Sequence, residues 1–310
     1  MTPKWLGMTL ETFDMEQNKL TAQVAGRFRL TATRPDGTVR VLADWFDNLI
    51  TDGGLNRLGT GAVAEKCRVG SGNTTPANGD TALVTQVAEA DIYSFTDGYD
   101  SVGNLYGYRR NVYRFSTGSA AGNLSEVGVG WAGGALFSRA LIKDGGGAPT
   151  TITVLADEIL DVVYELRIYR PSADVDTGIT ISGVSYTCTV RAANMGSWRP
   201  NTLMQYGAGG DGNQLVQGWG TDAALGAVTG QPSGTMNVGG VYAVTQGSYS
   251  SGSYQRAFRV VVGIASGTSA IKALIFYTPC GIYQMLVAPN IPKDATNRLT
   301  LDFNISWARR

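Results

Sequence analysis

The chain contains no histidine among its 310 residues. Imidazole is the side chain that most often exchanges protons near neutral pH, and it is a common zinc ligand. Its absence excludes Ser-His-Asp and Cys-His catalysis and any histidine-bound metal. The sequence also has no Gly-Lys-Ser/Thr phosphate-binding turn and no Gly-x-Ser-x-Gly elbow. Neither a nucleotide-binding P-loop nor a serine-hydrolase site is therefore indicated.

Carboxylates are the remaining candidates for acid–base chemistry. A glycoside hydrolase needs two of them about 5–10 Å apart in a cleft. Two groups of acidic residues lie close together in the sequence: Asp91, Asp97 and Asp100, and Asp157, Glu158 and Asp161. Each residue is more simply interpreted as part of a solvated loop or of the polar face of a strand. The sequence therefore favours a protein that is not an enzyme.

Two motifs have a partial match to ligand-binding loops. The glycines of Gly128-Val-Gly130-Trp-Ala-Gly133 fit a dinucleotide-binding pattern, but that pattern must open a helix, and residues 136–143 read as a strand. The segment Asp174-Val-Asp176-Thr-Gly178 begins like a calcium loop, but its twelfth position is Ser185, which cannot supply a carboxylate. We expect a glycine-rich turn and a polar linker, and no metal or nucleotide cofactor.

Cysteine content and charge narrow the class of protein further. Cys67, Cys188 and Cys280 are odd in number and far apart, which favours reduced core cysteines over a disulfide set or a metal knuckle. The 25 basic and 25 acidic side chains cancel and are scattered, so nucleic acid is not an expected partner. Residues 1–20 lack the pattern of a secretory signal, and no apolar run approaches the ~20 residues of a membrane span.

Aromatic side chains in a region rich in glycine and serine, residues 192–256, could form a recognition surface. Rings in loops can stack on the apolar faces of sugars, although they can equally hold long loops in place. The candidates are Trp198, Tyr206, Trp219, Tyr242, Tyr249 and Tyr254. A host surface glycan would be the corresponding ligand.

The surrounding elements are predicted to be β-strands. Glycine accounts for 41 residues and charged residues for only 16%, a composition that favours short strands joined by tight turns. Val24–Ala32 and Val39–Phe46 alternate apolar and polar residues around Arg34-Pro-Asp-Gly-Thr38, which predicts a hairpin. Residues 48–58 predict a short helix with Thr51 or Asp52 as its N-cap, and Asp80 could begin another that continues through Leu83 and Val87.

The longest alternations are Glu158–Arg170 and Arg298–Trp307. In the second, five apolar residues at period two predict a central strand with one buried face. Further strands are expected at residues 67–70, 108–115, 136–143, 151–155, 184–190, 258–264, 271–277 and 283–287. Together these patterns predict an all-β, antiparallel, sandwich-like fold with only short helices. A polar segment, Pro171–Gly178, predicts the division into β-rich parts 1–175 and 176–310.

Several stretches resemble a family of tailed-bacteriophage tail structural proteins. They are Trp45-Phe-Asp-Asn-Leu-Ile-Thr-Asp-Gly-Gly-Leu55, Cys67-Arg-Val-Gly-Ser-Gly-Asn-Thr-Thr-Pro76 with Asp80-Thr-Ala-Leu83, Asn123-Leu-Ser-Glu-Val-Gly-Val-Gly-Trp131, Leu136-Phe-Ser-Arg-Ala-Leu-Ile-Lys143, and Ile291-Pro-Lys293 with Ile305-Ser-Trp307. The resemblance runs from about residue 20 to the C-terminus and is weakest over residues 195–255. Its motifs are turns and strand ends.

The resemblance implies a structural subunit of a virion, made in the host cytoplasm and assembled with copies of itself and with other virion proteins. It leaves tail fibre, baseplate, collar and capsid-decoration positions open. A receptor- or glycan-binding adhesin of the tail is the first alternative, and a polysaccharide-degrading tailspike is the second.

Overall fold

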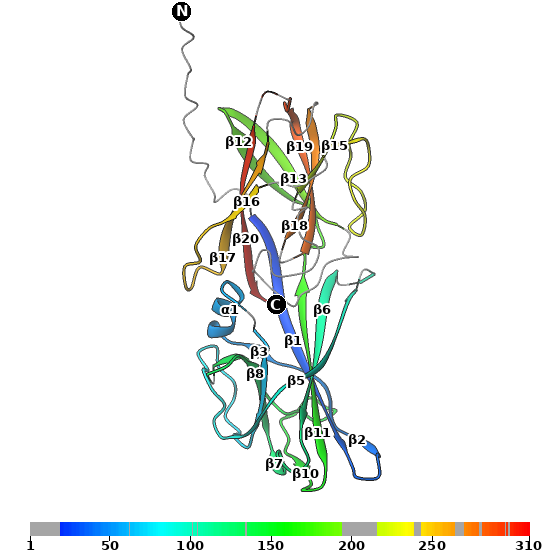
Figure 1. Cartoon of the computed structure of the whole chain (residues 1–310), viewed down its shortest axis with the longest axis vertical. Helices are drawn as coiled ribbons and strands as arrows, with labels where there is room; N and C mark the ends of the chain where they lie inside the picture. The colour runs from blue at the N-terminus through cyan, green and yellow to red at the C-terminus, as the bar shows by residue number, and fades with distance from the viewer. Residues whose placement is uncertain are drawn as a thin grey trace, which may run out of the picture.

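The computed structural model describes residues 19–310 except positions 62, 101, 104, 134, 194–215, 239–242, 264–269, 279–280, 295 and 297. It is 60% strand and 3% helical, with one helix, which confirms the all-β fold. The molecule is elongated (Figure 1). No helix in the described part of the chain is long and apolar enough to cross a membrane.

The larger sheet has 12 strands and contains both ends of the described chain. Its order is β16 (Ala243–Gln246), β17 (Gln255–Val262), β20 (Leu299–Arg309), β1 (Lys19–Thr33), β11 (Ile159–Tyr169), β6 (Tyr106–Phe115), β5 (Gln86–Asp100), β4 (Lys66–Gly70), β8 (Glu126–Gly130), β9 (Leu136–Leu141) and β3 (Leu49–Ile50), with β2 (Val39–Asp47) paired to β1. β20 runs parallel to β1, whereas β1 and β11 are antiparallel. The first and last described strands are therefore neighbours, and the sheet is mixed.

The second sheet has six strands and lies in the upper half of the view in Figure 1. Its order is β12 (Val175–Ile181), β13 (Val184–Ala192), β19 (Gly281–Ile291), β18 (Ile271–Thr278), β14 (Val216–Trp219) and β15 (Met236–Val238). A two-stranded sheet joins β7 (Gly122–Leu124) to β10 (Ile152–Val154). The interpretation of Pro171–Gly178 as a linker is wrong from Val175 onward, because β12 begins there and pairs with β13.

The predicted hairpin is confirmed in β1 and β2. Val24, Phe28 and Leu30 are buried on one face of β1, as the period-two pattern requires. The turn closes with the amide of Arg34 donating to the carbonyl of Thr38, and Gly37 takes a φ of +83° that glycine accepts without steric cost.

The predicted helix is confirmed as α1 (Asp52–Leu58), and the Thr51 hydroxyl caps it by accepting from the amide of Gly54 at 2.8 Å. The second predicted helix, from Asp80, is wrong, because residues 81–85 form bends and β5 follows. The buried carboxylate of Glu126 accepts hydrogen bonds from the amides of Val84 and Thr85, at 3.1 and 2.8 Å. These bonds satisfy backbone donors that would otherwise favour a turn of helix.

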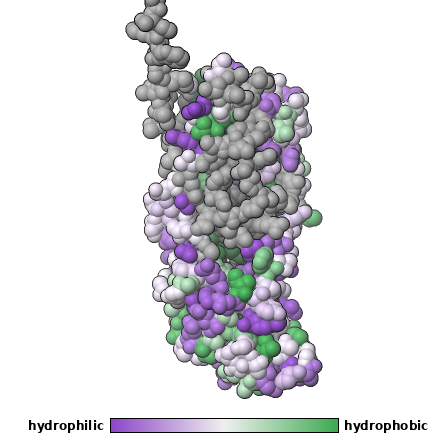
Figure 2. All heavy atoms as spheres, viewed as in Figure 1, coloured by the Kyte–Doolittle hydropathy of each residue, from purple (hydrophilic) through white to green (hydrophobic). Residues whose placement is uncertain are grey.

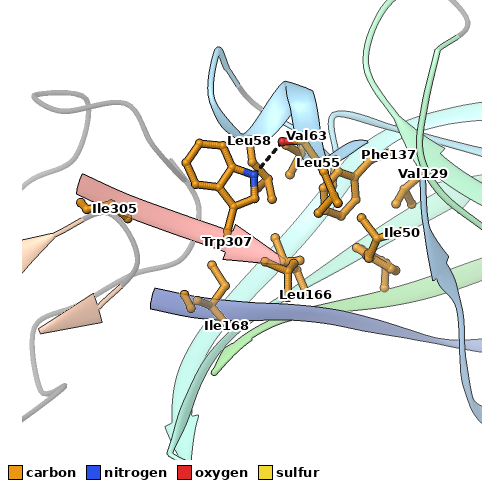
Figure 3. Close-up of a cluster of buried hydrophobic side chains, with 14 of the residues drawn as sticks. Ile50, Leu55, Leu58, Val63, Val129, Phe137, Leu166, Ile168, Ile305 and Trp307 are labelled. Carbon is orange, nitrogen blue, oxygen red and sulfur yellow. Dashed lines mark hydrogen bonds between the residues drawn. The ribbon is translucent and has the colours of Figure 1, made fainter. Parts of the chain in front are cut away.

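The C-terminal alternation is confirmed as β20, between β17 and β1. Its five apolar side chains are all buried: Leu299, Leu301, Phe303, Ile305 and Trp307. Figure 3 shows Trp307 pointing at α1, where its indole N–H donates to the carbonyl of Leu55 at 2.8 Å. Asp302 and Asn304 on the opposite face are also buried, and Asp302 is paired with Arg259 at 2.7 Å. Both faces of the strand are therefore covered at its middle.

One hydrophobic core includes residues from both sides of position 175. Phe28, Leu166, Phe276 and Phe303 all belong to this one cluster of buried side chains. A smaller cluster surrounds Trp219. The pairing of β1 with β20 also crosses the division between 1–175 and 176–310. The division of the chain into two β-rich parts, 1–175 and 176–310, therefore stays a prediction.

Candidate assembly surface

The described aromatic residues of the predicted recognition surface pack against the protein itself. Trp219 is 5% exposed and packs in the smaller core. Tyr249 stacks on Trp307 with ring centroids 5.7 Å apart, and its hydroxyl donates to the Asn56 side chain at 2.8 Å. Tyr254 packs against the main core. Each of the three therefore holds a segment of chain in place.

The other three candidates, Trp198, Tyr206 and Tyr242, lie outside the described residues. The recognition surface as a whole stays a prediction.

Three of the six acidic residues singled out in the sequence are bound to arginines. Asp97 accepts two hydrogen bonds from Arg109, at 2.7 and 2.8 Å. Arg114 binds Asp161 in the same bidentate way. Hydrogen bonds from Arg40 lower the pKa of Glu158 to about 2, against the opposing effect of burial. A general acid for glycoside cleavage needs a raised pKa, so Glu158 is unsuited to that role.

The remaining motifs take structural places. Gly128 and Gly130 lie in β8, and the strand β9 follows where a dinucleotide site would need a helix. Cys67 and Cys188 are free and buried, and Cys280 lies outside the described residues. No group of three or more acidic or cysteine side chains in the described part of the chain could hold a metal ion.

The most unusual surface of the described chain is on β5. Residues 86–91 of this strand pair with β4, and residues 92–100 pair with β6. A register shift between Ile92 and Ser94 marks the change of partner. Such a bulge bends a strand and lets it pass from one pairing partner to another. In the described part of the chain, residues 92–100 therefore have a strand on one side and an open edge on the other.

This open edge carries exposed aromatic side chains. Tyr93 is 62% exposed, Phe95 56% and Tyr99 50%. Six consecutive residues, 91–96, are exposed, so neither face of the strand is covered there. In Figure 2, most hydrophobic residues on the visible face of the lower half of the molecule are surrounded by hydrophilic residues. We define residues 92–100 of β5 as the β5 edge.

Arginines from β6 stack on two of these rings. The Arg109 guanidinium lies 4.1 Å from the centre of the Phe95 ring, and Arg114 lies 4.1 Å from the centre of the Tyr93 ring. Each arginine also holds an aspartate, Asp97 and Asp161 respectively. Cation–π contacts of this kind restrict the rings and leave their outer faces to solvent. The aromatic side chains are therefore ordered before any partner binds.

A buried carboxylate stiffens the sheet behind the β5 edge. Glu165 on β11 is 0% exposed and accepts hydrogen bonds from Arg27, Arg110 and Arg167, which lie on β1, β6 and β11. Burial by itself would raise the pKa of Glu165, but these hydrogen bonds outweigh burial and hold the pKa below its usual range. Arg110 is the register partner of Thr96, so this ion-pair group lies directly beside the β5 edge.

Sequence reasoning considered Asp97 and Asp100 of the β5 edge only as possible catalytic carboxylates and predicted no assembly surface there. The only local signal is the spacing of Tyr93 and Phe95, with the polar Ser94 and Thr96 beside them, which predicts a strand with a buried aromatic face. The structure leaves those rings exposed because both faces of β5 are open to solvent over residues 91–96, and the edge is open because β4 ends its pairing at Asp91. That register depends on contacts between segments far apart in the chain.

No family model, no curated protein and no solved structure matches this chain.

Proposed function

We propose that this chain is a structural subunit of a tailed-phage virion that acts by assembling with other chains and catalyses no reaction. The resemblance of its turns and strand ends to phage tail proteins suggests the particle. The observation that carries an assembly role is the β5 edge, because a long strand edge with exposed aromatic side chains is a template for pairing with another chain.

The chemistry of the described residues supports the same proposal. The acidic residues that could have formed a hydrolytic pair include Asp97, Glu158 and Asp161, and each is held by an arginine. The 12-stranded sheet contains the first and the last described strands and is crosslinked by the ion pairs of Glu165. An elongated β protein with an open strand edge that carries exposed aromatic side chains is suited to assembly into a multi-chain particle.

The test is to locate the chain in particles from cells that produce it in its natural context. Purified particles would be examined by mass spectrometry and by electron microscopy with an antibody against the chain. We expect a fixed copy number per particle and label at one site on the tail or collar. A chain that is abundant in the lysate and missing from the purified particles would contradict the proposal.

A further inference from the structure

We infer that the β5 edge joins two copies of this chain, which pair antiparallel around a two-fold axis at Thr96 and so form one continuous sheet. This inference rests on the proposed assembly role and names the partner and the contact. A two-fold contact uses the same patch on both copies and closes after two chains, so it leaves no exposed edge behind.

The backbone of the β5 edge is available for such a contact. Its nine residues, 92–100, span about 30 Å at ~3.3 Å per residue. The hydrogen-bond ladder of β4 ends at Asp91. Outside the β5–β6 ladder, no backbone-to-backbone hydrogen bond among the described residues involves positions 92–99. For residues 92–99, the outward amides and carbonyls thus have no backbone partner within the described part of the chain and could bind a strand.

Lysine and proline, which protect many free edges, are missing from this one, and its bulge lies at the start, between Ile92 and Ser94. Natural proteins block such edges with lysine, proline, inward-pointing charges or a covering loop. Residues 92–100 contain no lysine or proline, and the charge of Asp97 is matched by Arg109, with both side chains 13% exposed. A free edge with ordered aromatic side chains and a matched charge is suited to association.

The sequence around Thr96 is compatible with pairing to itself. In the antiparallel arrangement, Phe95 faces Asp97 of the other copy, and Ser94 faces Gly98. Tyr93 is the extra residue of the register shift between Ile92 and Ser94 and lies over Arg114, so the pairing is argued from residues 94–98. No two like charges meet across residues 94–98.

Phe95 and Asp97 also suit each other through Arg109. In each copy this guanidinium lies over Phe95 and binds Asp97 with two hydrogen bonds. Pairing around Thr96 brings the Phe95 of one copy beside the Asp97–Arg109 pair of the other. The guanidinium can then contact rings from both chains, which favours this register over one shifted by two residues.

The experiment measures self-association of the full chain by analytical ultracentrifugation over a range of concentrations. We expect the parent to form dimers. Thr96→Lys should weaken the dimer at least tenfold, since the two new charges oppose each other at the axis and lie beside Arg110. Val41→Lys is the matched control: Val41 is 52% exposed on β2, and this variant should associate as the parent does.

Cysteine cross-linking tests the register independently of the lysine variant. Opposed Cβ atoms in antiparallel strands lie ~4.5–5.5 Å apart, so Thr96→Cys should form a disulfide between two copies under mild oxidation. Val41→Cys should give no more cross-linked dimer than the parent. Circular dichroism spectra of all variants would check that they are folded.

Two results would overturn the inference: a parent that stays monomeric at all concentrations, or a Thr96→Cys variant that cross-links no better than Val41→Cys. A monomeric parent found at fixed copy number in particles would refute this contact and leave the virion role standing. Conversely, a dimer through Thr96 in a chain that is missing from particles would support this contact and contradict the virion role.

Discussion

Replacing Trp307 tests how strongly the C-terminal strand β20 stabilises the helix α1. Trp307 is 3% exposed at the end of β20, and Figure 3 shows its indole ring against the side chains of α1. Its N–H donates to the carbonyl of Leu55 at 2.8 Å. Leu55 is among the last four residues of a seven-residue helix, so its carbonyl has no partner within the helix. Trp307 supplies that partner.

The magnitude follows from the two kinds of contact that are lost. Truncating a buried tryptophan to alanine costs about 3–5 kcal/mol through lost burial and the cavity left behind. The unsatisfied Leu55 carbonyl adds about 1 kcal/mol. Trp307→Ala should therefore lower the free energy of unfolding by about 4–6 kcal/mol. Since total stabilities are ~5–15 kcal/mol, the variant would lose a large share of it.

Trp307→Phe separates the two contributions. It keeps a ring to stack on Tyr249, whose centroid lies 5.7 Å from that of Trp307, and removes only the N–H donor and part of the volume. We expect a loss of about 1–3 kcal/mol. Ser306→Ala, at the neighbouring half-buried position, is the control and should unfold within ~0.5 kcal/mol of the parent.

The assay is urea unfolding followed by circular dichroism, with hydrogen exchange to locate the effect. Trp307→Ala should reduce amide protection in α1 and in β20 together, because the side chain links them. Equal stability of the Phe and Ala variants would show that packing of the ring contributes nothing, since both variants lack the N–H donor. Loss of protection confined to β20 would show that the helix does not depend on the C-terminal strand.

Three further predictions concern the core, the helix and acid stability. Phe303→Ala should lower the free energy of unfolding by about 3–5 kcal/mol, because the ring is 2% exposed and its centroid lies 5.7 Å from that of Phe258 and 5.2 Å from that of Phe276. A melting temperature equal to the parent's would refute its place in the core. Thr51→Ala removes the N-cap of α1 and should lower the free energy of unfolding by about 0.5–2 kcal/mol in urea titrations, whereas Thr51→Ser should retain most of it. The pKa of Glu158 is about 2 in the folded protein, below its usual value, so its pairing with Arg40 stabilises the fold above about pH 4.5, and this contribution is lost as the pH falls toward 2. The melting temperature of Arg40→Met should accordingly fall less steeply than the parent's between pH 4.5 and 2, and parallel curves would contradict this.

Local chemistry in the sequence was sufficient to predict several elements. The alternation of β1, β11 and β20 shows which side chains are buried, because successive residues of a strand point to opposite faces. Thr51 or Asp52 before a short apolar spacing indicated the start of α1, and the structure shows that the Thr51 hydroxyl accepts from the amide three residues later. Each of these features depends on residues only a few positions apart.

Tertiary structure decided which strands are neighbours. Alternation shows that a strand has a buried face, but it does not say which strand lies beside it. The parallel pairing of β1 with β20 joins residues 19–24 to 304–309, and no local pattern indicates it. The failed helix after Asp80 has the same origin, because Glu126 reaches its amides from a distant strand.

The candidate assembly surface was likewise beyond the sequence. The spacing of Tyr93 and Phe95 predicts a half-buried strand wherever it occurs. Whether those rings meet a core or solvent depends on which distant segments pack over the faces of β5, and the open edge depends on where β4 stops pairing with it. Composition and alternation therefore determined an all-β protein without histidine chemistry, whereas long-range pairing alone decided which strand edge stayed open.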